Sequence, residues 1–324
     1  MRVFLTGGTG FIGGQVARQL RMRGDDVVAL VRSPDKADGL RESGCELIEG
    51  DLSSDEAIRR GIAGCDAVTH AGAVYKVGIP ESEHAAMYES NVKGTERVLN
   101  VAIAAGIPRI VYVSTVGVFG NTHRQLVDEA FERDSEFPSE YERTKTLAHE
   151  IAKRRIASGA PIVIVQPGGV YGPKDHSEIG NMIEQVRTGK LPAKAFTDAG
   201  FMFCHVEDIA AGIDLALDKG EVGESYVLSG EQATIGELID RVATIAGRKP
   251  PRFTMPSAVL KALAPLGPVI GPALGFPPNM RELIRSSDGV TYWATDAKAR
   301  RELGFEPRDL DTGLRQTLAA ADTA

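Results

Sequence analysis

The stretch TGGTGFIGG at residues 6–14 decides the fold. It follows the apolar run VFLT and leads into FIGGQVARQLRMRG, whose apolar residues recur at helical spacing. Gly7, Gly10 and Gly13 form a GxxGxxG pattern at this strand–helix junction. Glycines there let the backbone turn tightly and approach a pyrophosphate, while the start of the helix offers free N–H donors. The stretch therefore predicts a dinucleotide site at the first turn of an α/β sheet.

Outward from this motif, the first half of the chain alternates between strand-like and helix-like stretches. Two of the amphipathic stretches end at glycines, Gly24 and Gly106, which are positioned as helix stops. This alternation predicts a parallel sheet covered on both faces, with right-handed crossovers. The expected strands are VFLT (3–6), DVVALV (26–31), CELIEG (45–50), DAVTHA (66–71), RIVYVS (109–114) and PIVIVQ (161–166).

The second half of the chain has a looser pattern, with more proline, more glycine and irregular apolar spacing. Within it, HVEDIAAGIDLALDKG (205–220) still predicts a helix that belongs to the first part. We therefore expect a dinucleotide-binding domain of residues 1–172 with 201–230. A smaller, discontinuous substrate lobe would comprise residues 173–200 with 231–324.

Composition restricts the partners and the compartment. The 324 residues carry a formal charge of −7, which argues against a nucleic-acid partner because such a partner needs a basic face. Cys45, Cys65 and Cys204 show no ligand spacing and predict buried thiols in a reducing compartment. The six histidines are not grouped, so no metal site is expected. Because the first strand begins at Val3, without room for a leader, we expect a cytoplasmic protein.

One uncharged run, ALAPLGPVIGPALGFPPNM (262–280), has nearly the length of a membrane span. Its prolines and glycines make it a poor continuous helix. We interpret it as an apolar flap or as short broken helices, and we expect no membrane span.

The residues at the end of the second expected strand indicate whether the cofactor is NAD(H) or NADP(H). In folds that bind NAD, an acidic residue there accepts hydrogen bonds from the adenosine ribose. Here the strand runs into Arg32, followed by SPDK with Lys36, and no acid stands at the strand end. A guanidinium can bind a 2′-phosphate through two parallel hydrogen bonds, so NADP(H) is favoured over NAD(H), which stays possible. The alternative is that Arg32 is an ordinary solvated surface arginine. Asp51, in GDL, is placed to accept from the adenine amino group.

Tyr141 and Lys145 in YERTK are four residues apart, so on a helix they share one face. Alone, such a pair is more typical of a charged surface helix. Of the seven tyrosines, however, only Tyr141 has a lysine four residues on, and it follows a strand that ends in Ser-Thr.

Several motifs together now show a family resemblance. TGGTGFIG, GDL, NVKGT (91–95), VSTVGVFG (113–120), YERTK, QPGGVYGP (166–173) and HVEDIA (205–210) resemble, in order and spacing, those of the extended short-chain dehydrogenases/reductases. The resemblance implies a doubly wound Rossmann-type sheet and a Ser/Thr–Tyr–Lys catalytic set. It also implies a homodimer in which the helix bearing the tyrosine packs against its copy.

Matched position by position, the catalytic set becomes Thr115, Tyr141 and Lys145, with Ser114 as the alternative to Thr115. Thr115 would hold the substrate oxygen, and Tyr141 would exchange a proton with it. Lys145 would lower the pKa of that phenol and bind the nicotinamide ribose. The residues expected at the cofactor are Gly7, Thr9, Gly10, Phe11, Ile12, Gly13, Arg32, Lys36, Asp51, Leu52, Ala71, Gly72, Ala73, Ser114, Tyr141, Lys145, Pro167, Gly168 and Val170.

The remaining polar candidates receive structural interpretations. Asn91 and His205 are expected to make structural hydrogen bonds, while His176 could line the substrate mouth.

Departures from the sugar-modifying members of this family favour a reductase. Gln166 and Gly169 stand where those enzymes commonly have an arginine and an asparagine. Val116 and Gly117 follow Thr115, where dehydratases commonly have Asp–Glu. The chain looks closest to the dihydroflavonol-reductase-like branch, which predicts an NADPH-dependent reductase of a small apolar or aromatic ketone or aldehyde.

Two alternatives remain. One is an NAD-dependent nucleotide-sugar epimerase or dehydratase. The other is a non-catalytic NADP-binding regulator, against which the intact Thr–Tyr–Lys set argues.

Overall fold

A seven-stranded parallel sheet forms the centre of the larger part of the molecule. The computed structural model describes residues 1–267 and 277–322. The strand order is β3-β2-β1-β4-β5-β6-β9. The strands are β1 Arg2–Thr6, β2 Asp26–Val31, β3 Glu46–Glu49, β4 Ala67–His70, β5 Ile110–Val113, β6 Ile162–Pro167 and β9 Ser225–Leu228. All six strands expected from the sequence are confirmed, and β9 is an additional one.

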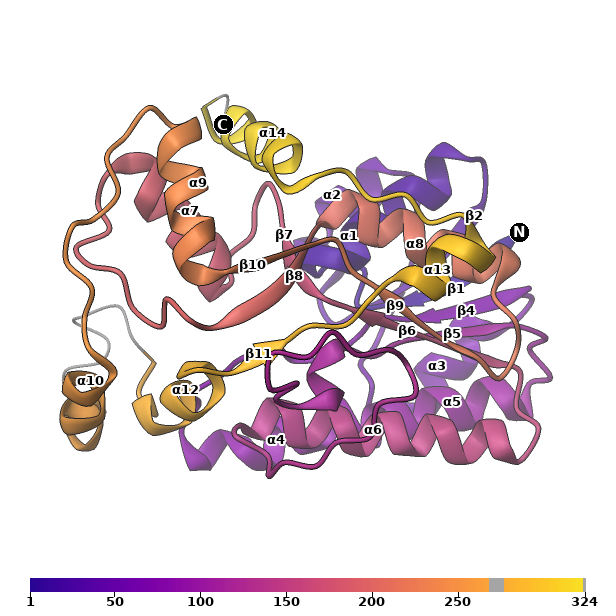
Figure 1. Cartoon of the computed structure of the whole chain (residues 1–324). Helices are drawn as coiled ribbons and strands as arrows, with labels where there is room; N and C mark the ends of the chain where they lie inside the picture. The colour runs from indigo at the N-terminus through magenta and orange to yellow at the C-terminus, as the bar shows by residue number, and fades with distance from the viewer. Residues whose placement is uncertain (268–276, 323–324) are drawn as a thin grey trace.

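Helices cover both faces of this sheet (Figure 1). On one face lie α1 (Phe11–Met22), α2 (Asp38–Glu42) and α8 (Val206–Lys219). On the other lie α3 (Asp55–Ile62), α5 (Gly94–Ala104) and α6 (Glu140–Ala157). Successive side chains of each strand enter opposite cores, as the period of two requires. The doubly wound Rossmann-type fold is thus confirmed.

The topology has a direct consequence for function. After β3 the chain crosses back over β1 to form β4, so the winding direction reverses between these two neighbouring strands. Loops at the carboxyl ends of β1 and β4 therefore diverge, which is where such sheets bind ligands.

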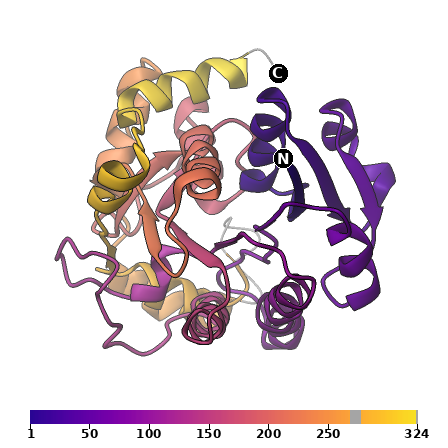
Figure 2. The same ribbon diagram turned by 90° about the vertical axis from the view of Figure 1, so that its right-hand side faces the viewer.

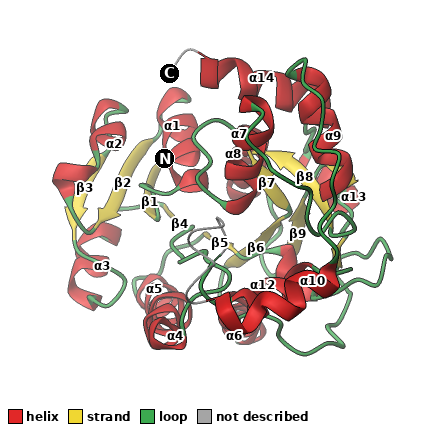
Figure 3. Ribbon diagram, turned by 90° about the vertical axis from the view of Figure 1, so that its left-hand side faces the viewer, coloured by secondary structure: helices red, strands yellow, loops and turns green. Residues whose placement is uncertain are grey.

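A second, smaller sheet is centred on β8 (Gly200–His205). This strand pairs with β7 (Gly169–Tyr171) and β11 (Thr291–Tyr292) in parallel and with β10 (Glu231–Thr234) in antiparallel fashion. A separate apolar core lies beside it, formed with α7 (Glu178–Thr188), α9 (Ile235–Ile245) and α14 (Leu310–Asp322). Helices α10 (Ser257–Leu263) and α12 (Met280–Ser287) pack together next to this sheet (Figure 3).

The remaining elements are short. They are the 3₁₀ helices Pro34–Lys36, Glu81–Glu83, Val116–Phe119 and Ala264–Leu266, the helix α4 (His84–Tyr88), the π-helical turn Glu89–Lys93 and the helix α13 (Ala297–Leu303). The helices expected to stop at Gly24 and Gly106 end within two residues of them, and both glycines have positive φ.

The chain returns to the large sheet near its end, where α13 packs against α8 and β9 on the side away from the indigo first strands (Figure 2). Leu303 and Phe305 enter the core beneath α8, and a Cβ atom on Gly212 would lie 3.0 Å from the Phe305 ring. Conversely, β8 belongs to the small sheet. The same holds for β7, so three segments pack across the boundaries expected from the sequence, and the division into two domains stays a prediction.

Two further expectations concern apolar segments and thiols. Of the run 262–280, residues 268–276 lie outside the described residues, and Ala264–Leu266 forms a short 3₁₀ helix. Within residues 1–267 and 277–322, no helix is both long and apolar enough to span a membrane. Cys45, Cys65 and Cys204 are buried free thiols, as expected.

Candidate functional site

A cavity of about 1650 Å³ runs along the carboxyl ends of the large sheet and continues beneath the small one. It begins at the glycine-rich loop after β1, passes the ends of β4 and β5, and reaches α7 and Phe201 of β8. Every residue expected at the cofactor or in the catalytic set lines this cavity. The structure therefore brings the predicted site residues together, while their roles stay predictions.

The glycine-rich loop has no room for side chains. Gly7 has φ of +77°, and a Cβ atom there would lie 2.7 Å from the backbone of Ala71. A Cβ atom on Gly13 would lie 2.2 Å from the carbonyl oxygen of Gly7. Gly10, the N-cap of α1, supplies no side chain to the first amides of the helix. This cradle fits the pyrophosphate of a dinucleotide, for which those amides are suitable donors.

Two cations flank the cavity where β2 ends. Arg32 and Lys36 are exposed, and both line the cavity. Among the residues that the structure describes, neither forms an ion pair or a side-chain hydrogen bond. Asp51 also lines this end, and its Oδ1 accepts hydrogen bonds from the backbone and hydroxyl of Ser53. These cations are thus free to meet an anionic group.

A buried histidine, which sequence reasoning passed over, fixes the end of β4. His70 is 1% exposed, and its ring nitrogens lie 2.6 Å from Thr6 Oγ1 and 2.9 Å from Thr95 Oγ1. The Thr95 hydroxyl donates to the carbonyl of Asn91, so it must accept from His70 Nε2. Nδ1 then accepts from Thr6, whose oxygen also accepts from Gly72 N–H. Burial lowers the pKa of His70 to about 3, so the ring stays neutral while it holds Gly72 in place.

Asn91 fixes the next part of the same loop. Its side-chain amide accepts from Val74 N–H at 2.7 Å and donates to Val74 C=O at 3.0 Å. It also donates to Thr144 Oγ1 on α6 at 3.1 Å. The residue lies in a π-helical turn, a form that often occurs at functional sites. The structural role expected for Asn91 agrees with these contacts.

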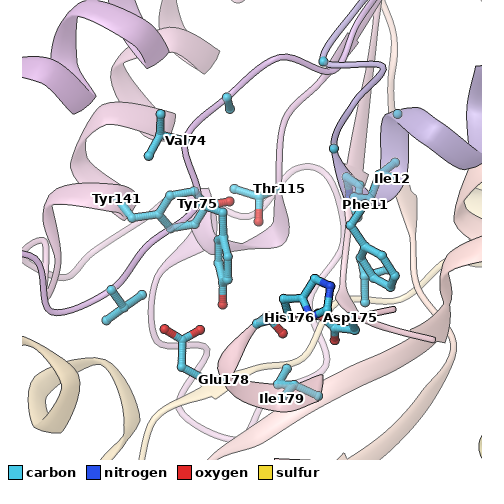
Figure 4. Close-up of a pocket in the computed structure, with 18 of the residues that line it drawn as sticks. Phe11, Ile12, Val74, Tyr75, Thr115, Tyr141, Asp175, His176, Glu178 and Ile179 are labelled. Atoms are coloured by element: carbon cyan, nitrogen blue, oxygen red, sulfur yellow. Dashed lines mark hydrogen bonds between the residues drawn. The ribbon is translucent and has the colours of Figure 1, made fainter. Parts of the chain in front are cut away.

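Tyr141 and Lys145 lie on successive turns at the start of α6. Burial raises the pKa of Tyr141 to about 12, and its hydrogen bond with Thr115 acts in the opposite direction. Lys145 donates from Nζ to the carbonyl of Val113 at 2.8 Å, and burial lowers its pKa to about 7. Figure 4 shows the Tyr141 ring with its hydroxyl beside Thr115, facing the cavity.

Ser114, the alternative to Thr115, has a different environment. It is buried, and its Oγ lies 2.9 Å from Nδ1 of His149. Burial lowers the pKa of His149 to about 4, so this pair is neutral near pH 7. Thr115 is less buried and lies beside Tyr141. Of the two residues, Thr115 is therefore the one whose side chain lies at Tyr141.

The end of the cavity beneath the small sheet combines apolar walls with a charged mouth, which includes Lys174 as well as the two carboxylates named below. The ring of Tyr75 contacts Tyr141 edge-on, at 4.8 Å between centroids, and its hydroxyl points toward Glu178 (Figure 4). Asp175 and His176 lie in the loop before α7 and also line the cavity. The apolar lining residues there include Ile179, Met182, Phe196, Phe201, Met255 and Leu283.

His205, in contrast, caps α8. Its ring is buried, accepts from the N–H of Glu207 and contacts Tyr171 edge-on. It is absent from the cavity lining, in agreement with the structural role expected for it.

An open Rossmann sheet with a glycine cradle at its switch point and a tyrosine–lysine helix beside it defines an NAD(P)-dependent oxidoreductase. Comparison with known proteins specifies the family. The model of the "NAD dependent epimerase/dehydratase family" matches residues 3–229. The chain belongs to this family, the extended short-chain dehydrogenases/reductases.

Relatives extend over nearly the whole chain. A 4-hydroxy-2-methyl-3-oxo-4-farnesyl-3,4-dihydroquinoline-1-oxide ketoreductase of Stigmatella aurantiaca is 32% identical over 95% of this chain and 92% of its own. A Synechocystis protein named "Putative dihydroflavonol 4-reductase" is 31% identical over 98% of this chain and 92% of its own. The resemblance to the dihydroflavonol-reductase-like branch is thereby confirmed.

Solved structures show the same fold. The crystal structure of gox2253 has a TM-score of 0.84 at 30% identity and covers 99% of this chain and 98% of that one. The UDP-glucose 4-epimerase of Thermus thermophilus, in complex with NAD, has a TM-score of 0.79 at 25% identity, over 100% of both chains. Reductases and epimerases thus both occur among the relatives.

Proposed function

We propose that this protein is an NADPH-dependent reductase of a neutral, mainly apolar ketone or aldehyde. The observation that carries this proposal is the place of Tyr141 and Thr115. Their hydroxyls lie side by side in the middle of the cavity, between the glycine-rich loop and the apolar walls beneath the small sheet. A carbonyl group held there would lie between a cofactor on the glycine cradle and the aromatic wall.

The residues around that point can complete a carbonyl reduction. NADPH, held on the glycine-rich loop of Gly7 and Gly13, would supply the hydride for the carbonyl carbon. The Thr115 hydroxyl donates a hydrogen bond to the carbonyl oxygen, and Tyr141 gives this oxygen its proton. The product is an alcohol, and Tyr141 then regains a proton from solvent. When Lys145 is protonated, its positive charge favours the phenolate left on Tyr141 between these steps.

The preference for NADPH rests on Arg32 and Lys36. Neither has an ion-pair partner among the described residues, and they flank the cavity at the end of β2. A 2′-phosphate would pair with them, whereas a ribose diol would leave them unused. No acidic residue occupies the end of β2, where an NAD-binding sheet would present one.

The substrate class rests on the far end of the cavity. Phe201, Met255 and Leu283 offer apolar contact area, while Asp175 and Glu178 present carboxylates at the mouth. Even with Lys174 beside them, these carboxylates give the mouth a net negative charge, which disfavours the diphosphate of a nucleotide sugar. A relative named as a ketoreductase of a farnesylated quinoline oxide supports an apolar ketone.

The direct test is titration of the purified protein with NADPH and with NADH, followed by cofactor fluorescence. We expect NADPH to bind more tightly and to exchange freely. A panel of apolar ketones and aldehydes should then be reduced, and carboxylate-bearing analogues should react more slowly. Equal affinity for both cofactors, or turnover of none of the carbonyls, would contradict the proposal.

A second candidate, the NAD-dependent nucleotide-sugar epimerase, is favoured by the fold shared with the Thermus thermophilus enzyme. Such an enzyme recycles its cofactor and needs none added. Protein that purifies with bound NAD(H) and converts nucleotide sugars without added cofactor would establish this candidate instead.

A further inference from the structure

A buried carboxylate lies directly after the proposed proton donor. Glu142 is 4% exposed. Its Oε2 accepts from Arg133 Nη2 at 2.9 Å, and its Oε1 accepts from the Tyr292 hydroxyl at 2.8 Å. Its own N–H donates to Ser139 Oγ, which caps α6. A charge buried this deeply is stable only when it is paired, and here both oxygens are.

Arg133 carries this connection to the Thr115 turn. Its Nη1 donates to the carbonyl of Gly117 at 3.1 Å, within the 3₁₀ helix that Thr115 caps. Its guanidinium also lies over the ring of Phe137, 4.5 Å from the centroid. The Arg133 side chain is only 9% exposed, so it bridges the two catalytic segments from the inside.

Tyr292 carries the connection to the substrate wall. It lies on β11 of the small sheet, and its ring stacks on Phe201 at 5.4 Å and 20°. Both rings line the cavity. A substrate packed against Phe201 would therefore be linked to Glu142 through the ring of Tyr292, which stacks on Phe201 and donates to Glu142.

We propose that Glu142 is a positioning residue that holds the Thr115 turn, the first turn of the Tyr141 helix and the substrate wall in one arrangement. The interaction is specific in geometry because a carboxylate accepts from both donors at once. A glutamine in its place would turn an N–H toward Arg133 or toward Tyr292. The inference rests on the proposed function only for the roles of Thr115 and Tyr141.

The charge of Glu142 also acts on Tyr141. Burial is the main cause that raises the pKa of Tyr141, and the negative charge of Glu142 adds to it. The other groups that face Glu142 are Arg133, Tyr292, Glu282 of α12 and Tyr75. Thr115 faces Tyr141, and Lys145 lies one turn along α6. Replacing Glu142 by glutamine removes this negative charge and leaves Arg133 unneutralised, so the pKa of Tyr141 should fall.

The test compares Glu142→Gln and Tyr292→Phe with Tyr171→Phe as a matched control. Tyr171 is another buried tyrosine of the small sheet, and its hydroxyl donates to the Leu310 carbonyl, away from α6. We expect kcat with a model ketone to fall about tenfold or more in both test variants, while the affinity for NADPH is unchanged. In Glu142→Gln, the alkaline limb of the pH–rate profile should also move to lower pH. Tyr171→Phe should leave kcat unchanged and affect only stability, as a lower Tm.

Several outcomes would overturn the proposal. A Glu142→Gln enzyme with the normal kcat and pH profile would do so, as would a loss of kcat no larger than that of Tyr171→Phe. If Glu142→Gln does not fold, Tyr292→Phe decides alone, since it keeps the buried ion pair. An unchanged kcat in Tyr292→Phe would then contradict the proposal.

A readout without turnover separates this inference from the proposed function. The phenol of Tyr141 can be titrated in the NADP⁺ complex by NMR of ¹³Cζ-labelled tyrosine, with Tyr141→Phe to assign its signal. A lower pKa in Glu142→Gln supports the positioning role even if no carbonyl compound proves to be a substrate. An unchanged pKa contradicts it even if the reductase activity is established.

Discussion

The α-carbon of Gly13 lies so close to Gly7 that a Cβ atom there would be 2.2 Å from the Gly7 carbonyl oxygen. At the adjacent Gly14, the nearest such contact is 3.4 Å, to the oxygen of Gly8, which is ordinary van der Waals contact. Both residues are in the first turn of α1. They offer a matched pair of substitutions for testing the cofactor cradle.

We expect Gly13→Ala to displace the loop and to weaken NADPH binding at least tenfold in a fluorescence titration. Gly14→Ala should bind NADPH normally and should gain up to about 1 kcal/mol of stability, because alanine favours a helix interior. Equal NADPH affinity of the two variants would contradict the cradle described for Gly7 and Gly13.

Tyr141→Phe should lower kcat by a factor of about 10² to 10⁴, because it removes the proposed proton donor but leaves the ring in place. The dissociation constant for NADPH should stay the same. Tyr88→Phe is the control. Tyr88 lies on α4, where its ring contacts Arg143 of the Tyr141 helix, and it is absent from the cavity lining. Wild-type turnover in Tyr141→Phe would show that the proton comes from elsewhere.

Arg32→Ala should weaken NADPH binding by about 10- to 100-fold and change NADH binding little, because only NADPH carries the phosphate that a guanidinium would bind. The matched control is Arg41→Ala, an exposed arginine nearby that pairs with Asp38 and does not line the cavity. If both cofactors lose affinity equally, the preference for NADPH does not come from Arg32.

Because of Asp214 on α8, we expect the stability of the folded protein to depend on pH. Burial raises its pKa from 3.8 to about 7, and among the described residues its Oδ1 has no hydrogen-bond partner. The protonated form therefore stabilises the fold, an effect that is complete below about pH 4 and is lost as the pH rises through about 7. Because asparagine resembles the protonated form, Asp214→Asn should raise Tm above pH 7 and leave it unchanged at pH 4.

Asp218→Asn is the control for this measurement. Asp218 lies one turn further along α8, where it is more exposed and pairs with Arg23. Its substitution should lower Tm slightly at neutral pH, if at all. A Tm of Asp214→Asn that is independent of pH would contradict the raised pKa.

The large sheet could be predicted from the sequence for a physical reason. Strands covered on both faces are continuous apolar runs, such as VVALV before Arg32, and each is followed by a helical period. The small sheet lacks that signal, because β10 is EQAT and β11 has only two residues. Their pairing with β8 depends on contacts between distant segments.

The candidate site divides in the same way. The glycine loop and the Tyr141–Lys145 pair are local patterns, so their spacing alone indicated them. The partners of Glu142 lie 9 and 150 residues away in the sequence, and no spacing rule connects them. His70 was missed for the same reason, because Thr6, which binds its ring, is 64 residues away.

The return of Leu303 and Phe305 to the core beneath α8 bears on how this protein can be divided. The family match ends at residue 229, yet the apolar surface of α8 is completed only by a segment some seventy residues later. A fragment ending at residue 229 would expose that surface to water and be prone to aggregate. We therefore expect a cut at residue 229 to impair nucleotide binding as well as substrate recognition, and a grafted substrate lobe would have to bring a segment equivalent to Leu303 and Phe305 with it.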